Sequence, residues 1–195
     1  MLIGITGRKG SGKDTLAAMF VTLAESRGIP AAQITFAGPI KSFCAEVFGW
    51  SEDQINGDSR LREVPDQRYE MSPEAQSEHG QRFLSPRIAL QQLGTEWGRA
   101  MNPDIWARLG VRRAEEMLES THSLIVISDV RFPNEANAIS AAGGYMIRKG
   151  GGAEGDGHAS EAHVDSIEVD GMIPFCDTVE AVEIYVRIIG SRLFL

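Results

Sequence analysis

The segment from residue 2 to residue 15 constrains the fold of this 195-residue chain more than any other part of its sequence. The apolar run 2–6 suits a buried strand, and a glycine-rich stretch separates it from a helix predicted over 13–27, which Gly28 closes. Glycines let the backbone curl so that successive N–H groups point inward at an anion, and the N-terminus of the helix adds further donors. The segment therefore predicts a phosphate-binding loop at the start of an α/β fold.

The residues of this loop are candidates for holding the phosphates of a nucleotide cofactor. They are Gly7, Lys9, Gly10, Ser11, Gly12, Lys13, Asp14 and Thr15. Lys13 is long enough to reach the terminal phosphates, which also makes it a candidate catalytic residue. The alternative is a glycine-rich turn that ends in lysine by chance, but the strand before the loop and the helix after it favour phosphate binding.

Asp14 departs from the common pattern, in which a serine or threonine at this position ligates Mg²⁺. A carboxylate oxygen is a suitable Mg²⁺ ligand, either directly or through a water molecule, so we expect Asp14 to hold the metal. The next residue, Thr15, supplies a hydroxyl that could bind an α-phosphate. Asp14 could instead be a first-turn acid that the helix dipole favours, and both roles can hold together.

The remaining apolar segments predict the architecture. Short strands are expected at 34–36, 124–127 and 145–147, and helical patterns separate them. Near the C-terminus, Asp177 followed by Glu180 resembles a capping box, which would open a helix with Val179, Val182, Tyr185 and Ile189 on its inner side. The alternation predicts βαβ units and an α/β fold with a mainly parallel central sheet flanked by helices on both faces. We expect one domain over 1–195.

A helix predicted over 85–101 carries a row of polar side chains. Ser85 and Pro86 are suited to its N-cap and first turn. Four residues spaced four apart would lie along one face of this helix: Arg87, Gln91, Thr95 and Arg99. Two arginines with an amide and a hydroxyl between them suit the phosphate, sugar and base of a nucleotide. A solvated outer face explains the spacing equally well.

A charged pair follows the strand predicted at 124–127. Asp129 and Arg131 are two residues apart in extended chain, so their side chains should point into one cleft. Ligands in parallel sheets lie beyond the carboxyl ends of the strands. An acid beside a guanidinium could there orient an acceptor and neutralise phosphate charge. The alternative is a structural ion pair.

Two segments do not follow the alternation of strands and helices. The segment 51–84 is polar and charged, and the segment 149–160 is rich in glycine. Both are either surface excursions or lids that close over a ligand, since long loops in compact domains often act as lids. We expect the first to lie on the substrate side.

Composition excludes several classes of protein. The net charge of −8 opposes a broad nucleic-acid surface. No apolar stretch is long enough to span a membrane, and the N-terminal run is too short for a secretory signal. The two cysteines, Cys44 and Cys176, are interpreted as reduced, buried thiols, and the four histidines show no metal-ligand spacing. We therefore expect a cytoplasmic protein whose partners are small molecules.

Further blocks follow the loop sequence Gly-Ser-Gly-Lys-Asp-Thr at 10–15 in a fixed order. They are Phe-Ala-Gly-Pro-Ile-Lys at 36–41, Pro-Arg at 86–87, Leu-Gln-Gln-Leu-Gly-Thr-Glu at 90–96, Pro-Asp-Ile-Trp at 103–106, Asp-Val-Arg-Phe-Pro-Asn-Glu at 129–135 and His-Ala-Ser-Glu at 158–161. Through most of its length the chain thus resembles the phage-type deoxynucleoside monophosphate kinases of the P-loop superfamily.

The resemblance implies the three-layer fold of phosphate-loop (P-loop) NTPases, a function, and roles for particular residues. ATP with Mg²⁺ would donate its γ-phosphoryl group to a deoxynucleoside 5′-monophosphate, in the host cytoplasm if the protein is phage-encoded. Arg148 would stabilise charge on the transferring group. The acceptor would be surrounded by residues of the later blocks, which are Lys41, Arg87, Gln91, Thr95, Arg99, Trp106, Asp129, Arg131 and Glu135. Trp106 offers a ring for stacking, although core packing is an equal alternative. A homodimer is a further expectation.

Two positions depart from the pattern of this family. Gly38 stands where an acid is expected, and Phe-Cys-Asp-Thr at 175–178 replaces Asn-Asp-Gly-Thr. Two other functions stay open. One is a P-loop kinase with another acceptor, such as dephospho-coenzyme A or phosphomevalonate, and the other is a nucleotide-dependent switch or assembly factor.

Overall fold

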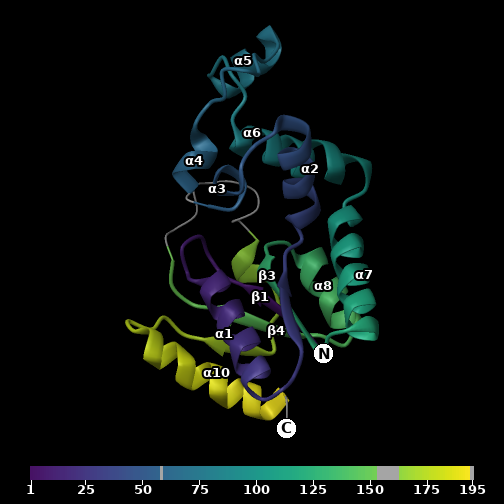
Figure 1. Cartoon of the computed structure of the whole chain (residues 1–195), viewed down its shortest axis with the longest axis vertical. Helices are drawn as coiled ribbons and strands as arrows, with labels where there is room; N and C mark the ends of the chain where they lie inside the picture. The colour runs from purple at the N-terminus through teal and green to yellow at the C-terminus, as the bar shows by residue number, and fades with distance from the viewer. Residues whose placement is uncertain (58, 153–162, 194–195) are drawn as a thin grey trace. The chain divides into compact units, whose positions relative to one another are not determined.

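The computed structural model describes residues 1–57, 59–152 and 163–193 (Figure 1). The chain divides into two compact units. The sheet unit comprises residues 1–36 and 107–195, and the helical unit comprises residues 37–106. The phosphate loop and the charged pair after the strand at 124–127 belong to the sheet unit. The helix predicted over 85–101 belongs to the helical unit. One kinase domain over 1–195 stays a prediction.

The described residues of the sheet unit form a five-stranded sheet in the order β2-β3-β1-β4-β5, and every pairing in it is parallel. The strands are β1 (Leu2–Thr6), β2 (Ala31–Ile34), β3 (Leu124–Val130), β4 (Tyr145–Lys149) and β5 (Gly171–Ile173). This confirms the predicted α/β fold class. Because β1 lies at the centre, the loop that follows it emerges in the middle of the carboxyl edge, where ligands bind in such sheets.

Helices cover both faces of the sheet (Figure 1). One face packs against α1 (Lys13–Ser26) and α10 (Val179–Leu193), with fully buried side chains such as Phe20 and Leu16 between the layers. The other packs against α7 (Ile105–Ser120) and α8 (Pro133–Ala141), around Ile125 and Ile139. Strands buried on both faces explain the continuous apolar runs of β1 and β3. A short 3₁₀ helix, η2, spans Val164–Ser166.

The strand predicted at 34–36 is wrong, because β2 spans Ala31–Ile34. Phe36 is buried as a core residue beyond the strand: its ring lies over the backbone of Gly110, where a Cβ would be 2.3 Å from Phe36 Cδ1. The apolar character of residues 34–36 thus reflects burial and does not coincide with the strand. The three-residue strand β5 was missed, since so short an element leaves little pattern to read.

The C-terminal helix begins one residue later than the capping-box pattern indicated. Thr178, and not Asp177, is its cap, because the amide of Ala181 donates to Thr178 Oγ1 at 3.3 Å. The inner side carries Val182, Tyr185 and Ile189 as expected. Val179 is 54% exposed, so its predicted inward position is wrong.

The helical unit is built from short helices around a small aromatic core. Phe48 stacks on Trp50 with ring centroids 4.4 Å apart, and Tyr69 meets both rings edge-on. Offset and edge-to-face arrangements of this kind add to the stabilisation from burial. The helices are α2 (Gly38–Phe48), α3 (Glu52–Ile55), α4 (Ser59–Glu63), α5 (Pro73–His79), α6 (Pro86–Gln91) and the π-helix η1 (Gln92–Arg99).

The helix predicted over 85–101 is only partly correct. Ser85 caps α6 as expected, by accepting the amide of Ile88. From Gln92 the chain continues as η1, whose hydrogen bonds span five residues instead of four. The Trp106 side chain explains the change, because its Nε1 donates to the Gly94 carbonyl at 2.7 Å. A side chain that inserts into a helical ladder is a known cause of such irregularity.

The two cysteines differ in exposure. Cys44 is fully buried, and burial raises the pKa of its thiol to about 11. Cys176 is also a free thiol but only half-buried, so its predicted burial is wrong.

In the part of the chain that the structure describes, no helix combines the length and apolar character that a membrane crossing requires.

Candidate active site

The phosphate loop is held in shape by close packing at its first glycine and a left-handed turn at its last. A Cβ on Gly7 would lie 2.6 Å from the Lys149 carbonyl oxygen and 2.8 Å from Ser11 Oγ, so only glycine fits there. Gly12 has φ +85° and is the N-cap residue of α1. Its carbonyl accepts the first helical hydrogen bond from the amide of Leu16 at 2.9 Å. The predicted strand, loop and helix are thus present.

Lys13 is drawn inward onto the loop. The side chain is 9% exposed, and its Nζ donates to the carbonyl of Gly7 at 2.6 Å and to that of Arg8 at 2.7 Å. These bonds place the ammonium above the curled backbone, in the region where loop amides and the helix N-terminus favour an anion. The contact of Lys13 with phosphate stays a prediction.

Two hydroxyls beneath the loop add to its polar character. Thr6 Oγ1 and Ser11 Oγ are both buried and have no hydrogen-bond partner among the described residues. A buried unsatisfied hydroxyl costs about 1–3 kcal/mol, and a ligand oxygen at the loop would relieve part of that cost. The remaining predicted loop residues are exposed at the surface: Lys9, Gly10 and Thr15.

Asp14 is joined to the ends of two neighbouring strands. Ser128 Oγ donates to Asp14 Oδ1 at 2.7 Å, and Gln33 Nε2 donates to Ser128 Oγ at 2.9 Å. No group of three or more His, Cys, Asp or Glu side chains is arranged to hold a metal within residues 1–57, 59–152 and 163–193. One exposed carboxylate still fits Mg²⁺, because this ion commonly takes one or two carboxylates together with substrate phosphates.

Ser128 and Gln33 were not among the predicted site residues. They lie 114 and 19 residues from Asp14 in the sequence, and only the order β2-β3-β1 brings them to it. One signal could have found Ser128, namely a polar residue at the end of a buried apolar strand. The sequence interpretation gave that significance to the adjacent Asp129.

The segment after β3 holds the predicted charged pair. Asp129 Oδ1 accepts the Phe36 amide at 2.7 Å, which ties the ends of β2 and β3 together. Glu135 is 3% exposed, and its Oε2 accepts the backbone amides of Arg131 at 2.8 Å and Phe132 at 3.1 Å. Glu135 thus fixes the backbone that carries the Arg131 side chain and caps α8. A direct role of Glu135 with substrate stays a prediction.

Arg148 makes structural contacts on β4. Its Nη2 donates to the carbonyls of Val164 and Asp165, each at 3.3 Å, and to that of Ile167. The Nε is buried without a hydrogen-bond partner in the described part of the chain. These contacts favour the interpretation that Arg148 fixes segment 164–167. A role on the transferring phosphoryl group stays a prediction.

An ion pair connects the phosphate loop with the same segment. Arg8 Nη2 contacts Asp165 Oδ2 at 2.7 Å, and this hydrogen bond is the main reason why the pKa of Asp165 is lowered. Sequence reasoning missed the pair. The segment predicted as a glycine-rich lid, 149–160, lies outside the described residues from 153 onward, as does the block at 158–161.

The other predicted substrate residues belong to the helical unit: Lys41, Arg87, Gln91, Thr95, Arg99 and Trp106. Arg87 and Gln91 keep their four-residue spacing in α6, whereas Thr95 and Arg99 lie in η1, where the turn is wider. The predicted single α-helical face is therefore interrupted at Gln92, and the roles of these residues stay predictions.

Several of these side chains already have partners. Arg87 Nε contacts Glu63 Oε1 at 2.6 Å, and Arg99 Nη1 donates to the Pro103 carbonyl at 3.2 Å. The Trp106 ring packs on the backbone of Gly98, where a Cβ would be 2.6 Å from its Cζ2. Core packing is thus the role that the structure gives Trp106, and stacking on a base stays a prediction.

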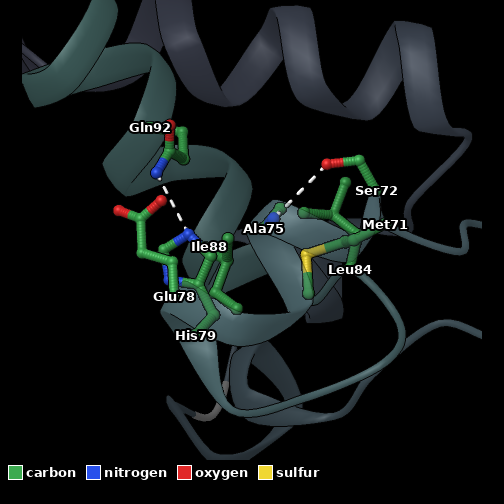
Figure 2. Close-up of a pocket in the computed structure, with 8 residues that line it drawn as sticks. All are labelled: Met71, Ser72, Ala75, Glu78, His79, Leu84, Ile88 and Gln92. Carbon is green, nitrogen blue, oxygen red and sulfur yellow. Dashed lines mark hydrogen bonds between the residues drawn. The ribbon is translucent and has the colours of Figure 1, made fainter.

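A pocket of about 230 Å³ lies elsewhere in the helical unit, and none of the predicted site residues lines it (Figure 2). Among the lining residues, His79 Nε2 and Gln92 Nε2 form a hydrogen bond with 3.1 Å between the two nitrogens. Figure 2 marks this bond with a dashed line. Met71, Leu84 and Ile88 give the pocket an apolar wall.

Comparison with known proteins identifies one relative by sequence. The chain is 35% identical over 181 residues to a protein of Acanthamoeba polyphaga mimivirus named "Putative deoxynucleotide monophosphate kinase", with 86% of this chain and 84% of that protein covered. No protein-family model matches the chain.

Two solved structures are similar at lower levels. They are shikimate kinase from Aquifex aeolicus vf5 (12% identity, TM-score 0.46, 99% of each chain) and a gluconokinase from Sinorhizobium meliloti 1021 (14% identity, TM-score 0.40, 98% of this chain and 94% of that one). Because both TM-scores are below 0.5, neither likeness supports a conclusion about this chain.

The sequence relative, the parallel sheet and the phosphate loop agree with one another. Identity of 35% over most of both chains is enough to establish common family membership. Whether the protein is of phage type stays a prediction. The chain belongs to the deoxynucleotide monophosphate kinase family, with a P-loop kinase fold.

Proposed function

We propose that this protein transfers the γ-phosphoryl group of ATP to a deoxynucleoside 5′-monophosphate and so forms the diphosphate. The observation that carries the proposal is the phosphate loop with Lys13 folded over it, at the central strand of a parallel sheet. The choice of a deoxynucleotide as acceptor is supported by the name of the viral relative and by the ordered blocks of sequence.

The reaction places a positioning and electrostatic task on the protein. Lys13 and the loop amides would bind the β- and γ-phosphates and stabilise the negative charge that develops during transfer. Asp14 would hold Mg²⁺, which when bound neutralises phosphate charge and orients the triphosphate. No side chain needs to form a covalent intermediate.

The acceptor requires cationic and polar groups around its phosphate, sugar and base. Arg131, with its backbone held by Glu135, would orient the acceptor phosphate in the sheet unit. The resemblance also assigns acceptor contacts to residues of the helical unit, which stay candidates: Lys41, Arg87, Gln91, Thr95, Arg99 and Trp106. Arginine suits this task because its planar donors match phosphate oxygens in pairs.

An acceptor panel tests the proposal. The purified chain is incubated with ATP and Mg²⁺ and, in turn, with each deoxynucleoside and ribonucleoside monophosphate, dephospho-coenzyme A and phosphomevalonate. ADP release is measured together with chromatographic identification of the product, and reactions without acceptor correct for hydrolysis. We expect equal amounts of ADP and a deoxynucleoside diphosphate with at least one acceptor.

Three results would overturn the proposal. One is transfer to dephospho-coenzyme A or phosphomevalonate with none to any deoxynucleotide. Another is transfer to ribonucleotides alone. The third is slow ATP hydrolysis that only a partner protein stimulates, which would indicate a switch or an assembly factor.

A further inference from the structure

We propose that Ser128 and Gln33 are positioning residues for Mg²⁺, and that this chain exchanges the two side-chain types of the usual P-loop metal site. In P-loop NTPases a loop serine or threonine and an aspartate on a strand hold the ion together. Here the loop supplies the carboxylate, Asp14, and the strand supplies the hydroxyl, Ser128. The inference rests on the proposed function only in taking Mg²⁺-ATP as the phosphoryl donor.

The hydrogen bonds fix the direction of each donor. An ionised carboxylate can only accept, so the single hydroxyl proton of Ser128 must point at Asp14 Oδ1, 2.7 Å away. The lone pairs of Ser128 Oγ then accept from Gln33 Nε2 at 2.9 Å. The same nitrogen lies 3.5 Å from Asp14 Oδ1. In all of these contacts Asp14 Oδ1 is the acceptor.

The network occupies one oxygen of Asp14 and leaves the other available. Both of these bonds end on Oδ1, and Oδ2 makes no hydrogen bond within residues 1–57, 59–152 and 163–193. Asp14 itself is exposed beside the loop. A carboxylate anchored through one oxygen keeps the other at a fixed place, which is how neighbouring groups orient metal ligands in proteins.

The side chains of Ser128 and Asp129 lie on opposite faces of the sheet, because successive residues of a strand alternate between its two faces. Leu124 and Val126 face the core under α1, so Ser128, at the same phase of β3, points toward α1 and Asp14. Asp129 faces the opposite side of the sheet, where its Oδ1 accepts the Phe36 amide. The strand residue that faces the loop carboxylate is thus a hydroxyl, and it is 0% exposed.

A purely structural role for Ser128 makes different predictions. A buried hydroxyl could simply satisfy its own hydrogen-bonding needs through Asp14 and Gln33. Loss of that hydroxyl would then lower stability and leave the metal dependence of ATP binding intact. The two roles can therefore be separated by measuring ATP affinity by calorimetry with Mg²⁺ and with EDTA.

The first variants remove the network. We expect Mg²⁺ to tighten ATP binding to the wild-type chain, and Ser128→Ala to reduce this tightening by about tenfold, the lower end of the effect of second-layer residues on metal affinity. Gln33→Ala, an exposed position, should act in the same direction and keeps the test valid if Ser128→Ala does not fold. Affinity in EDTA should stay unchanged. Ser26→Ala, which removes a hydroxyl at the far end of α1, is the matched control.

An exchange variant tests the pairing itself. Asp14→Ser alone removes the carboxylate from the site and should abolish metal-dependent tightening. Asp14→Ser combined with Ser128→Asp restores one acid and one hydroxyl in the usual order, and should recover most of the tightening. Such non-additivity is the signature of directly coupled residues.

The results that overturn the inference are distinct from those that overturn the proposed function. Wild-type metal dependence in both Ser128→Ala and Gln33→Ala would refute the positioning role. An exchange variant no better than Asp14→Ser, despite native folding, would refute the exchanged arrangement. ATP affinity needs no acceptor, so failure of the acceptor panel with these effects intact would refute only the choice of substrate.

Discussion

The close approach at Gly7 allows a prediction with a worked magnitude. In Gly7→Ala the new Cβ would lie 2.6 Å from the Lys149 carbonyl oxygen, and contacts below 3.0 Å force a shift. Lys149 is part of β4 and cannot yield easily, so the loop must move. Overpacking of this kind costs about 1–3 kcal/mol, and the backbone conformation at φ +155° adds about 1–3 kcal/mol.

We therefore expect Gly7→Ala to destabilise the sheet unit by roughly 2–6 kcal/mol and to lower Tm by at least about 4 °C, since each kcal/mol shifts Tm by about 2–4 °C in a chain of this size. Gly10→Ala is the matched control: it has φ +74° but no atom within 4 Å of the new Cβ, so only the backbone cost of about 1–2 kcal/mol remains.

Urea and thermal unfolding, followed by circular dichroism without ligand, measure both variants. Because Gly7 also supplies a carbonyl to Lys13 Nζ, the loop shift should weaken ATP binding in parallel. A stability loss in Gly7→Ala no larger than that in Gly10→Ala would refute the steric reasoning.

Three further predictions concern charged groups. Lys13→Ala should lower kcat by about 10²–10³ and cost no more than about 2 kcal/mol of stability, which kinetics and urea unfolding would check against Lys9→Ala. Arg131→Ala should cost about 3 kcal/mol in transition-state stabilisation, measured as kcat/KM for the acceptor, while Glu135 still holds the backbone amide of residue 131. Hydrogen bonds from Arg68 hold the pKa of Asp66 well below its usual value, so the stability from this pair is complete above about pH 4 and falls as the pH drops below it. Tryptophan fluorescence during acid unfolding should show this slope in wild type and a shallower one in Asp66→Asn.

The parts of the fold that depend on local sequence were predictable. The phosphate loop is one continuous segment, and the strand, glycine-rich turn and helix that its sequence indicates are all present. The parallel sheet followed from apolar runs alternating with helices, because strands buried on both faces leave a strong hydrophobic signal.

The parts that depend on distant contacts were not predictable. Phe36 was predicted to lie in a strand, but it lies beyond β2 and its ring packs on Gly110 of α7. The change to a π-helix at Gln92 depends on the Trp106 indole, which reaches back to Gly94. A local pattern carries no information on such partners.

The same limit applies to the candidate site. The family resemblance implied a substrate contact for Glu135, which stays a prediction, and gave no sign that its carboxylate also holds the backbone that carries Arg131. Ser128 and Gln33 reach Asp14 only through the order of the strands. The sequence predicted which charged residues lie near the loop. Which side chains hold these residues in position depends on contacts between distant segments, and only the structure shows those contacts.

Titration calorimetry of ATP into the purified chain with Mg²⁺ tests most directly whether the loop at 7–15 binds a nucleotide triphosphate. We predict a saturable heat of association for the wild-type chain and a much weaker one for Lys13→Ala, whose ammonium lies over the loop. No heat with ATP or GTP at millimolar concentration, from a chain shown to be folded, would contradict the assignment of a phosphate-binding loop and the kinase function that follows from it.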